Sequence, residues 1–155
     1  MNKKQKKHLE DMGNFKKKIQ VIIFKKRDSS IEYLSLKLNQ KRGGLWQPIT
    51  AKVEEKENLK EALIRELKEE VNVESYERII ENIYEFTYPG KSENFIETVF
   101  AVQIKEKTLI DINKNPCDEH VDYLWSSYDG TFELYEYYTQ KEALTKLHKI
   151  LLNEK

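Results

Sequence analysis

Apolar residues in the first third of the chain recur in patterns that are typical of β-strands. Ile19–Phe24 is a short apolar run that fits a central strand, and Ile31–Leu38 places apolar side chains at alternate positions. Residues 41–44 contain two glycines and predict a turn after this second strand. Residues 46–53 then predict a short extended piece, in which Pro48 disfavours an uninterrupted central strand.

The second half of the chain contains three further segments with strand character. Tyr76–Tyr88 is rich in isoleucine and aromatic residues, alternates in its second half and is broken by a Pro-Gly pair. Phe95–Ile104 is apolar and β-branched, and Val121–Trp125 predicts a short final strand. The chain therefore carries one group of strands before residue 54 and another after residue 75.

A helical period separates these two groups of strands. The helix is predicted to begin after Asn58, a good N-cap residue, with Glu61 placed to complete a capping box. Its apolar stripe consists of Leu59, Ala62, Leu63, Leu67 and Val71. This spacing predicts an amphipathic helix that packs one face against the sheet.

Two more helices are predicted near the C-terminus, over Phe132–Tyr138 and Gln140–Leu152. Thr139 and Glu142 are predicted to form a capping box at the start of the second helix. Three tyrosines are expected to pack against these helices, namely Tyr135, Tyr137 and Tyr138. Strands outnumber helices and straddle the central helix, a pattern that predicts an α/β fold with a mixed sheet between helices.

Length and charge narrow the class of protein. Residues 15–155 are long enough to form a single domain, and residues 1–14 predict a basic, disordered arm. The 27 basic and 27 acidic residues give no net charge, so no nucleic-acid partner is expected. No apolar run of membrane-spanning length or apolar signal segment occurs, and the one cysteine, Cys117, excludes an internal disulfide. We therefore expect a cytoplasmic protein without membrane contact, whose oligomeric state is open.

Three glutamates of the central helix point to a metal site. Glu66, Glu69 and Glu70 are related by i,i+3 and i,i+4 spacing, so their carboxylates share one side of the helix. At about 100° per residue, Glu66 and Glu70 border the apolar stripe. Like charges at this spacing destabilise a helix, whereas a hard cation such as Mg2+ would reverse the sign. The alternative interpretation is the ordinary solvated face of a Glu/Lys-rich helix.

A longer pattern contains this cluster. Its members are Glu57, Arg65, Glu66, Leu67, Glu69, Glu70 and Val73, and seven residues separate the first two. The pattern resembles the Nudix box. The resemblance implies a Nudix-type α/β/α sandwich with a mixed β-sheet, and a hydrolase that acts on a phosphoric anhydride with Mg2+, or with Mn2+ as a substitute.

Two positions depart from the glycines of the Nudix box. Asn72 replaces the second glycine, and asparagine is the next choice after glycine for a left-handed helix end. Ala51 replaces the first glycine. If the backbone there needs a positive φ, alanine is strained by about 1–2 kcal/mol. If the backbone only offers a carbonyl oxygen, alanine serves equally well.

The resemblance also implies roles for individual residues. Glu66, Glu69 and Glu70 would bind the divalent ions, helped by the Ala51 carbonyl and by Glu119 in the downstream segment 118–125. The general base stays open between Glu66, Glu69 and Glu119. We group Glu57 and Arg65 with the catalytic set as an ion pair that holds the loop against the helix. The alternative for residues 119 and 120 is a loop carboxylate and a surface imidazole.

The segment before the helix suggests a subgroup. Residues 46–54 are similar to the corresponding segment of bacterial dATP pyrophosphohydrolases, which also act on dihydroneopterin triphosphate. Within this segment Trp46, Gln47 and Lys52 are candidates for substrate contacts, Lys52 with a phosphate. Trp46, Tyr84 and Tyr88 are candidates for stacking on a purine or pterin ring, because aromatic faces bind flat heterocycles.

The expected reaction releases a nucleoside monophosphate and pyrophosphate from a nucleoside triphosphate or pterin triphosphate. Two alternatives are a dinucleoside polyphosphate (diadenosine tetraphosphate) hydrolase and a non-catalytic Nudix module that binds a nucleotide.

Overall fold

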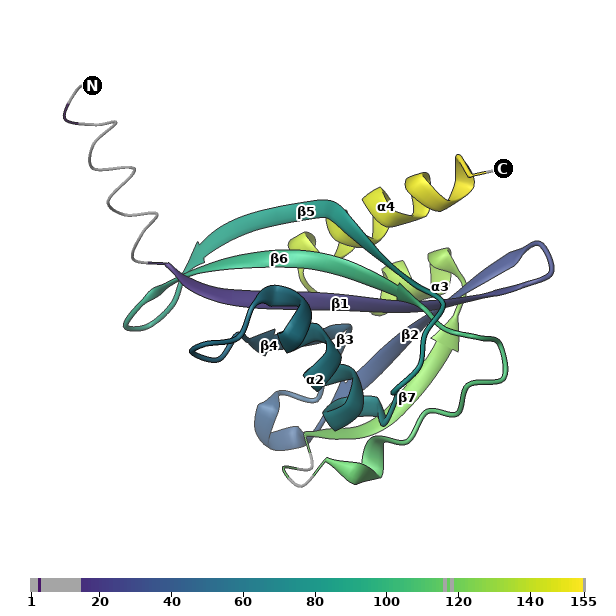
Figure 1. Cartoon of the computed structure of the whole chain (residues 1–155), viewed down its shortest axis with the longest axis horizontal. Helices are drawn as coiled ribbons and strands as arrows, with labels where there is room; N and C mark the ends of the chain where they lie inside the picture. The colour runs from purple at the N-terminus through teal and green to yellow at the C-terminus, as the bar shows by residue number, and fades with distance from the viewer. Residues whose placement is uncertain (1–2, 4–14, 116, 118, 155) are drawn as a thin grey trace.

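The computed structural model describes residues 3, 15–115, 117 and 119–154 (Figure 1). Apart from Lys3, the basic arm expected over residues 1–14 lies outside the described residues. The strands are β1 (Lys16–Arg27), β2 (Ser30–Leu38), β3 (Trp46–Gln47), β4 (Ile49–Lys52), β5 (Arg78–Pro89), β6 (Asn94–Gln103) and β7 (His120–Ser126). The α-helices in this part of the chain are α2 (Leu59–Val71), α3 (Tyr128–Leu134) and α4 (Tyr138–Leu152).

Strand β1 is the centre of a mixed seven-stranded sheet. Strand β6 runs parallel to β1 along one edge, and β5 pairs antiparallel with the far edge of β6. The other edge of β1 is shared, because residues 18–21 pair with β4 and residues 24–27 pair with β2, both antiparallel. Strands β1 and β2 therefore separate along their length, and β4 occupies the opening between them. Pro48 interrupts the extended piece between β3 and β4, as the sequence predicted.

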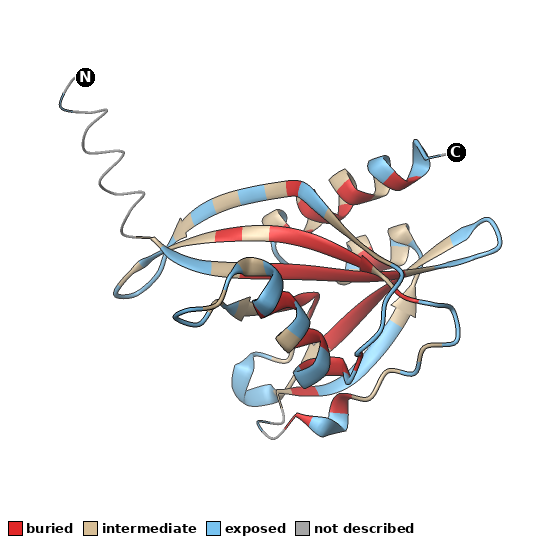
Figure 2. Cartoon of the chain, in the orientation of Figure 1, coloured by how far each residue is buried: buried red, intermediate tan, exposed pale blue. Residues whose placement is uncertain are grey.

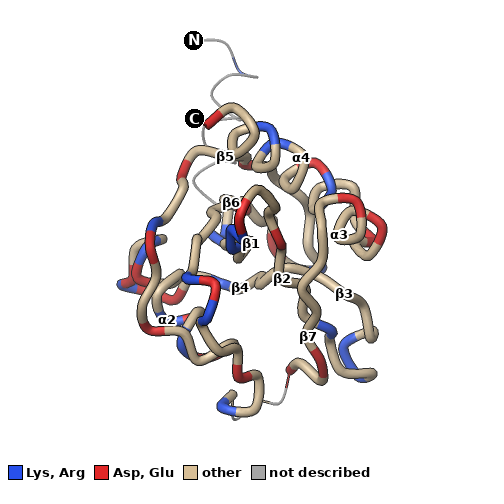
Figure 3. The backbone as a smooth tube through the Cα atoms, turned by 90° about the vertical axis from the view of Figure 1, so that its right-hand side faces the viewer, with Lys and Arg blue, Asp and Glu red and all other residues tan. Residues whose placement is uncertain are grey.

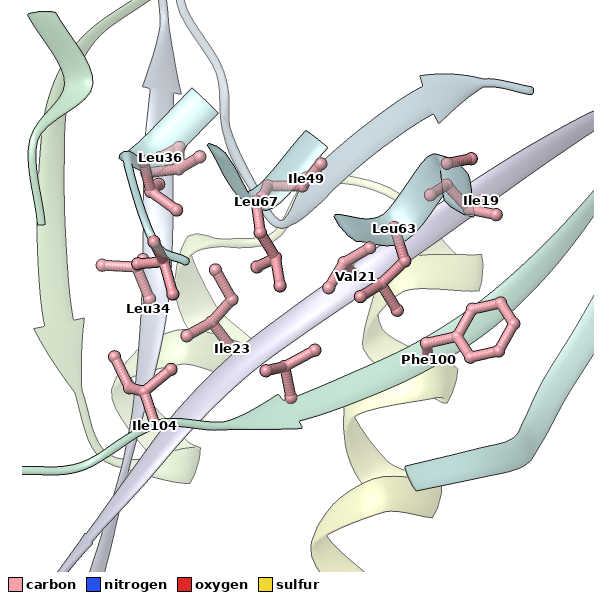
Figure 4. Close-up of a cluster of buried hydrophobic side chains, with 14 of the residues drawn as sticks. Ile19, Val21, Ile23, Leu34, Leu36, Ile49, Leu63, Leu67, Phe100 and Ile104 are labelled. Carbon is pink, nitrogen blue, oxygen red and sulfur yellow. The ribbon is translucent and has the colours of Figure 1, made fainter. Parts of the chain in front are cut away.

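The sheet is covered on both faces. Alternate side chains of β1 point in opposite directions, so Ile19, Val21 and Ile23 meet the apolar face of α2 (Figure 4). Ile22 and Phe24 pack on the other face, with the helices α3 and α4. The middle parts of β1 and β6 are buried (Figure 2). The predicted central strand and the α/β/α sandwich with a mixed sheet are confirmed.

Helix α2 is fixed at both ends by the residues that the sequence indicated. The Asn58 side chain accepts a hydrogen bond from the Glu61 backbone N–H at 2.8 Å, and the Glu61 carboxylate accepts one from the Asn58 N–H at 3.0 Å. At the other end Asn72 adopts the left-handed conformation, with φ 57° and ψ 38°. These caps define where the helix begins and ends, and so help to hold its acidic side chains in place.

The C-terminal predictions need correction. Helix α3 begins earlier than predicted, because the Ser127 side chain accepts a hydrogen bond from the Gly130 N–H at 3.2 Å and so caps its first turn. The predicted capping box of Thr139 and Glu142 does not form. Helix α4 begins at Tyr138, two residues before the position at which it would begin if Thr139 were the N-cap.

Only one of the three tyrosines that were predicted to pack against the C-terminal helices is buried. Tyr135 is buried, but Tyr137 and Tyr138 are exposed to solvent instead of packing against the helices. None of the helices that the structure describes has both the length and the apolar character that a membrane crossing requires.

Candidate active site

Helix α2 presents a compact group of carboxylates. Glu66, Glu69 and Glu70 each offer an oxygen atom, and these atoms lie within 4.8 Å of one another. Glu66 is 7% exposed and Glu70 is 4% exposed, whereas Glu69 faces solvent. The predicted position at the border of the apolar stripe is therefore confirmed for Glu66 and Glu70. Lys and Arg positions lie close to acidic ones along α2 (Figure 3).

Arg65 connects this group to the loop before the helix. Its guanidinium donates two hydrogen bonds to Glu57, at 2.6 and 3.1 Å, and one to the Lys52 carbonyl at 3.3 Å. The same side chain donates to Glu66 at 2.6 Å and to Glu69 at 3.3 Å. The hydrogen bond from Arg65 lowers the pKa of Glu57 below its ordinary value. Arg65 thus holds the loop and two of the three clustered carboxylates together.

One arginine does not neutralise the cluster. Burial, followed by the negative charges of Glu70 and Glu69, raises the pKa of Glu66 to about 7, although Arg65 acts in the opposite direction. A buried carboxylate beside other carboxylates loses hydration and gains repulsion. The oxygen donor set and the excess negative charge match the preference of a hard divalent cation.

Glu70 has two partners that lie far from it in the sequence. The Asn115 side-chain amide donates a hydrogen bond to Glu70 Oε1 at 2.8 Å. His120 Nδ1 lies 2.7 Å from Glu70 Oε2, and both side chains are buried. The alternative of a surface imidazole at His120 is therefore wrong. Neither residue is predicted from the sequence as a partner of Glu70, and no local pattern marks Asn115.

Glu119 lies beside this pair. Glu70, Glu119 and His120 also offer ligand atoms within 4.8 Å of one another, so Glu70 belongs to both groups. The Glu119 carboxylate pairs with Arg42 at 3.3 Å and is partly exposed. The start of β7 thus brings Glu119 to the edge of the α2 cluster.

Ala51 lies in β4, opposite Ile19 of β1. The non-glycine residues with a positive φ in the described part of the chain are Asp28, Lys56, Asn72 and Asn82. Ala51 therefore has no strained backbone. Of the two cases that the sequence left open, the structure agrees with the one in which alanine replaces glycine without strain.

A cavity of about 370 Å³ lies beside strands β4, β5 and β6. It is lined by Lys18, Gln47, Thr50, Phe86, Tyr88, Glu97, Tyr137, Thr139 and Gln140. Two residues proposed from the sequence, Gln47 and Tyr88, are among them, and Trp46 and Tyr84 are not among the described lining residues. The Lys52 ammonium lies 5.6 Å from the Phe95 ring centre and 3.9 Å from Glu93.

Strand β4 joins the cavity to the carboxylate cluster. Thr50 lines the cavity, and two residues later the Lys52 carbonyl accepts the hydrogen bond from Arg65 of the cluster. The cavity and the cluster are therefore both in contact with β4.

The sequence matches the NUDIX domain over residues 16–147. The chain belongs to the Nudix hydrolase family. A comparison with curated proteins gives no match. The enzyme class expected from the Nudix box is thus confirmed at the level of the family, whose members typically use a divalent metal.

Several solved Nudix structures share this fold. A C. elegans Ap4A hydrolase binary complex is 20% identical, covers 90% of this chain and 99% of its own, and has a TM-score of 0.75. The E. coli dihydroneopterin triphosphate pyrophosphohydrolase is 21% identical, with coverages of 91% and 99% and a TM-score of 0.70. A MutT NUDIX hydrolase from Burkholderia pseudomallei is 20% identical, with coverages of 85% and 97% and a TM-score of 0.65. At these identities the likeness concerns the fold.

Proposed function

We propose that this Nudix hydrolase is a Mg2+-dependent pyrophosphohydrolase that cleaves a nucleoside triphosphate or dihydroneopterin triphosphate to the monophosphate and pyrophosphate. The observation that carries the proposal is the convergence of Glu66, Glu69 and Glu70 within 4.8 Å on one helix. Bound divalent ions would neutralise phosphate charge and make a water molecule more acidic.

Different residues of the chain would bind the ions and hold the ion ligands in place. Glu66, Glu69 and Glu70 would hold the ions, with Glu119 and the Ala51 carbonyl as further oxygen donors. Arg65 fixes Glu66 and Glu69 through its hydrogen bonds, while Glu57 fixes Arg65 through a bidentate pair. Such orientation of ligands by neighbouring groups tunes both metal affinity and activity.

Attack by water on a non-terminal phosphorus also needs a proton acceptor. Glu66, Glu69 and Glu119 are the candidates predicted from the sequence, and each belongs to one of the two clusters of possible metal ligands that share Glu70. Lys52 would contribute a positive charge to the phosphates; its ammonium lies near the ring of Phe95, which contacts the cavity residue Tyr88. Gln47 in the cavity wall and the neighbouring Trp46 complete the proposed substrate contacts.

Both alternatives make different predictions. A dinucleoside polyphosphate hydrolase would release a nucleoside triphosphate from diadenosine tetraphosphate. A non-catalytic module would bind a nucleotide without product release. The retention of every acidic residue of the Nudix box favours the enzyme over the module.

The test is a Mg2+-dependent screen with product identification. Wild-type protein is incubated with nucleoside triphosphates, dihydroneopterin triphosphate and diadenosine tetraphosphate, and the products are separated by chromatography. We expect a monophosphate and pyrophosphate from a triphosphate, and loss of this product in Glu69→Gln. Release of orthophosphate, or equal turnover in Glu69→Gln, would contradict the proposal.

A further inference from the structure

The cavity beside β4 contains a buried carboxylate that belongs to neither acidic group of the metal site. Glu97 is 5% exposed and lines the cavity from β6. Alternation along β6 places Glu97 on the same face as Val99 and Ala101, which pack with α4. The acidic side chains of α2 lie against the opposite face of the sheet. Glu97 therefore requires an explanation of its own.

Two neutral donors hold Glu97 in place. The Gln20 side-chain amide donates to one carboxylate oxygen at 3.0 Å, and the Tyr88 hydroxyl donates to the other at 3.1 Å. Burial raises the pKa of Glu97, while Gln20, Lys18 and Tyr88 act in the opposite direction. Since each carboxylate oxygen can accept two hydrogen bonds, both retain one free acceptor position.

A second acceptor in the cavity wall has no partner. Gln140 of α4 is 5% exposed, and its side-chain oxygen accepts no hydrogen bond from the described residues. Buried acceptors without donors are rare because their desolvation is uncompensated. Because this oxygen has almost no accessible surface, it is not open to the cavity, and Glu97 is the acceptor in the wall that suits a ligand with N–H groups.

The remaining walls suit a flat ring. Phe86 and Tyr88 are stacked, with ring centres 5.8 Å apart and an angle of 28° between their planes. Tyr137, which is 54% exposed, also lines the cavity. Aromatic surfaces of this kind bind planar heterocycles, and a few polar groups fix their orientation.

Guanine and pterin carry a ring N–H next to an exocyclic amino group, so one carboxylate can accept from both. Adenine places a ring acceptor beside its amino group, and that acceptor would face the carboxylate. We propose that the cavity recognises a heterocycle that contains a 2-amino-4-oxopyrimidine ring, as guanine and pterin do, and that Glu97 determines this specificity. The inference rests on the proposed function, since it names the ring of the triphosphate that the enzyme cleaves.

The first test compares kcat/KM for dihydroneopterin triphosphate, dGTP and dATP in the wild type and in Glu97→Gln. Glutamine has one acceptor and one donor, which is the arrangement that pairs with adenine. We expect the preference for the 2-amino-4-oxo substrates over dATP to fall by about 10- to 100-fold in Glu97→Gln. Glu85→Gln is the matched control, because Glu85 lies on the neighbouring strand β5 and bonds to Thr98 outside the cavity. An unchanged preference in Glu97→Gln would overturn the inference.

A binding measurement separates this inference from the cleavage reaction. Calorimetric titrations with GMP, neopterin and AMP are run without divalent metal, so that no hydrolysis contributes. Wild-type protein should bind GMP and neopterin more tightly than AMP, and Glu97→Gln should reduce this preference. Such binding without any triphosphate cleavage would support the inference while contradicting the proposed function. Equal binding of all three compounds would overturn the inference even if cleavage occurs.

Discussion

The two buried carboxylate sites of this Nudix hydrolase differ in the charged and polar groups that surround their carboxylates. On the α2 side, Glu66 and Glu70 lie beside each other and beside Glu69, with Arg65 as a partner of two of the three. On the α4 side, Glu97 accepts hydrogen bonds from the neutral donors Gln20 and Tyr88, with the positive charge of Lys18 nearby. The first arrangement leaves an excess of negative charge, which favours the binding of a cation. The second leaves free hydrogen-bond acceptor positions, which favour a ligand with N–H groups.

The comparison shows that burial alone does not define what a carboxylate binds. Burial raises the pKa of both Glu66 and Glu97. Only Glu66 is raised further by neighbouring carboxylates. The number of nearby like charges, and the hydrogen-bond donors already in place, distinguish the proposed metal site from the proposed heterocycle site.

The largest effect is expected from removing one charge of the α2 cluster. Glu70→Gln should lower kcat by about 1,000-fold, because bound metal supplies several kcal/mol of transition-state stabilisation. Steady-state kinetics with the preferred triphosphate measures this, and circular dichroism confirms that the variant is folded. Glu74→Gln, which changes an exposed carboxylate paired with Lys68, is the control. Equal kcat in Glu70→Gln and the control would remove the distinction between the two sites.

The next effect concerns stability without metal. The pKa of Glu66 is about 7 in the folded protein, whereas the ordinary value for a glutamate, which we take for the unfolded chain, is 4.5. The folded state therefore holds its proton more tightly, and the free energy of unfolding should fall as pH rises from about 4.5 to about 7, by about 3 kcal/mol at most. Urea unfolding in EDTA at pH 5 and pH 8 measures this fall. Glu66→Gln should show a smaller fall, and an equal fall in both proteins would contradict the account of the cluster.

A smaller loss is expected from the partner of Glu70. His120→Asn should lower activity at limiting Mg2+ by about 10- to 100-fold, because groups that orient metal ligands contribute on this scale. The loss should diminish at high Mg2+ concentration, which a Mg2+ titration of the rate would reveal. His148→Asn is the control, since His148 contacts Tyr33 and Tyr128 on the other face of the sheet. An unaltered Mg2+ requirement in His120→Asn would mean that this contact does not position Glu70 for metal.

The smallest effect is expected where the helix of the cluster ends. Asn72→Gly should raise the free energy of unfolding by at most about 1 kcal/mol, because glycine adopts the left-handed conformation at lower cost than asparagine. Thermal unfolding measures the gain, and kcat should stay unchanged. A large gain in kcat would show that the departure from the Nudix box at this position limits the metal site.

Local signals in the sequence predicted a large part of this structure. Asn58 and Asn72 marked the ends of α2, and Pro48 marked the break between β3 and β4, because each acts through its own backbone and its nearest neighbours. Thr139 also predicted the start of a helix, but this prediction is wrong. Helix α4 begins one residue before it, with a first turn that has no side-chain cap.

Contacts between segments that lie far apart in the chain could not be predicted from the sequence. Asn115 and His120 reach Glu70 across 45 and 50 positions, and Gln20 reaches Glu97 across 77. No periodicity marks such pairs, since they arise only when the sheet and its helices are assembled. The Nudix box located the carboxylates of the cluster, whereas the role of Tyr137 in the cavity wall had no local sign.

The most direct test of the central claim is a crystal of the protein grown with Mn2+ and a non-hydrolysable triphosphate analogue. Anomalous diffraction locates the manganese without reference to activity. The account predicts a peak coordinated by oxygen atoms of Glu66, Glu69 and Glu70. An ordered nucleotide with no manganese beside these three side chains would contradict it.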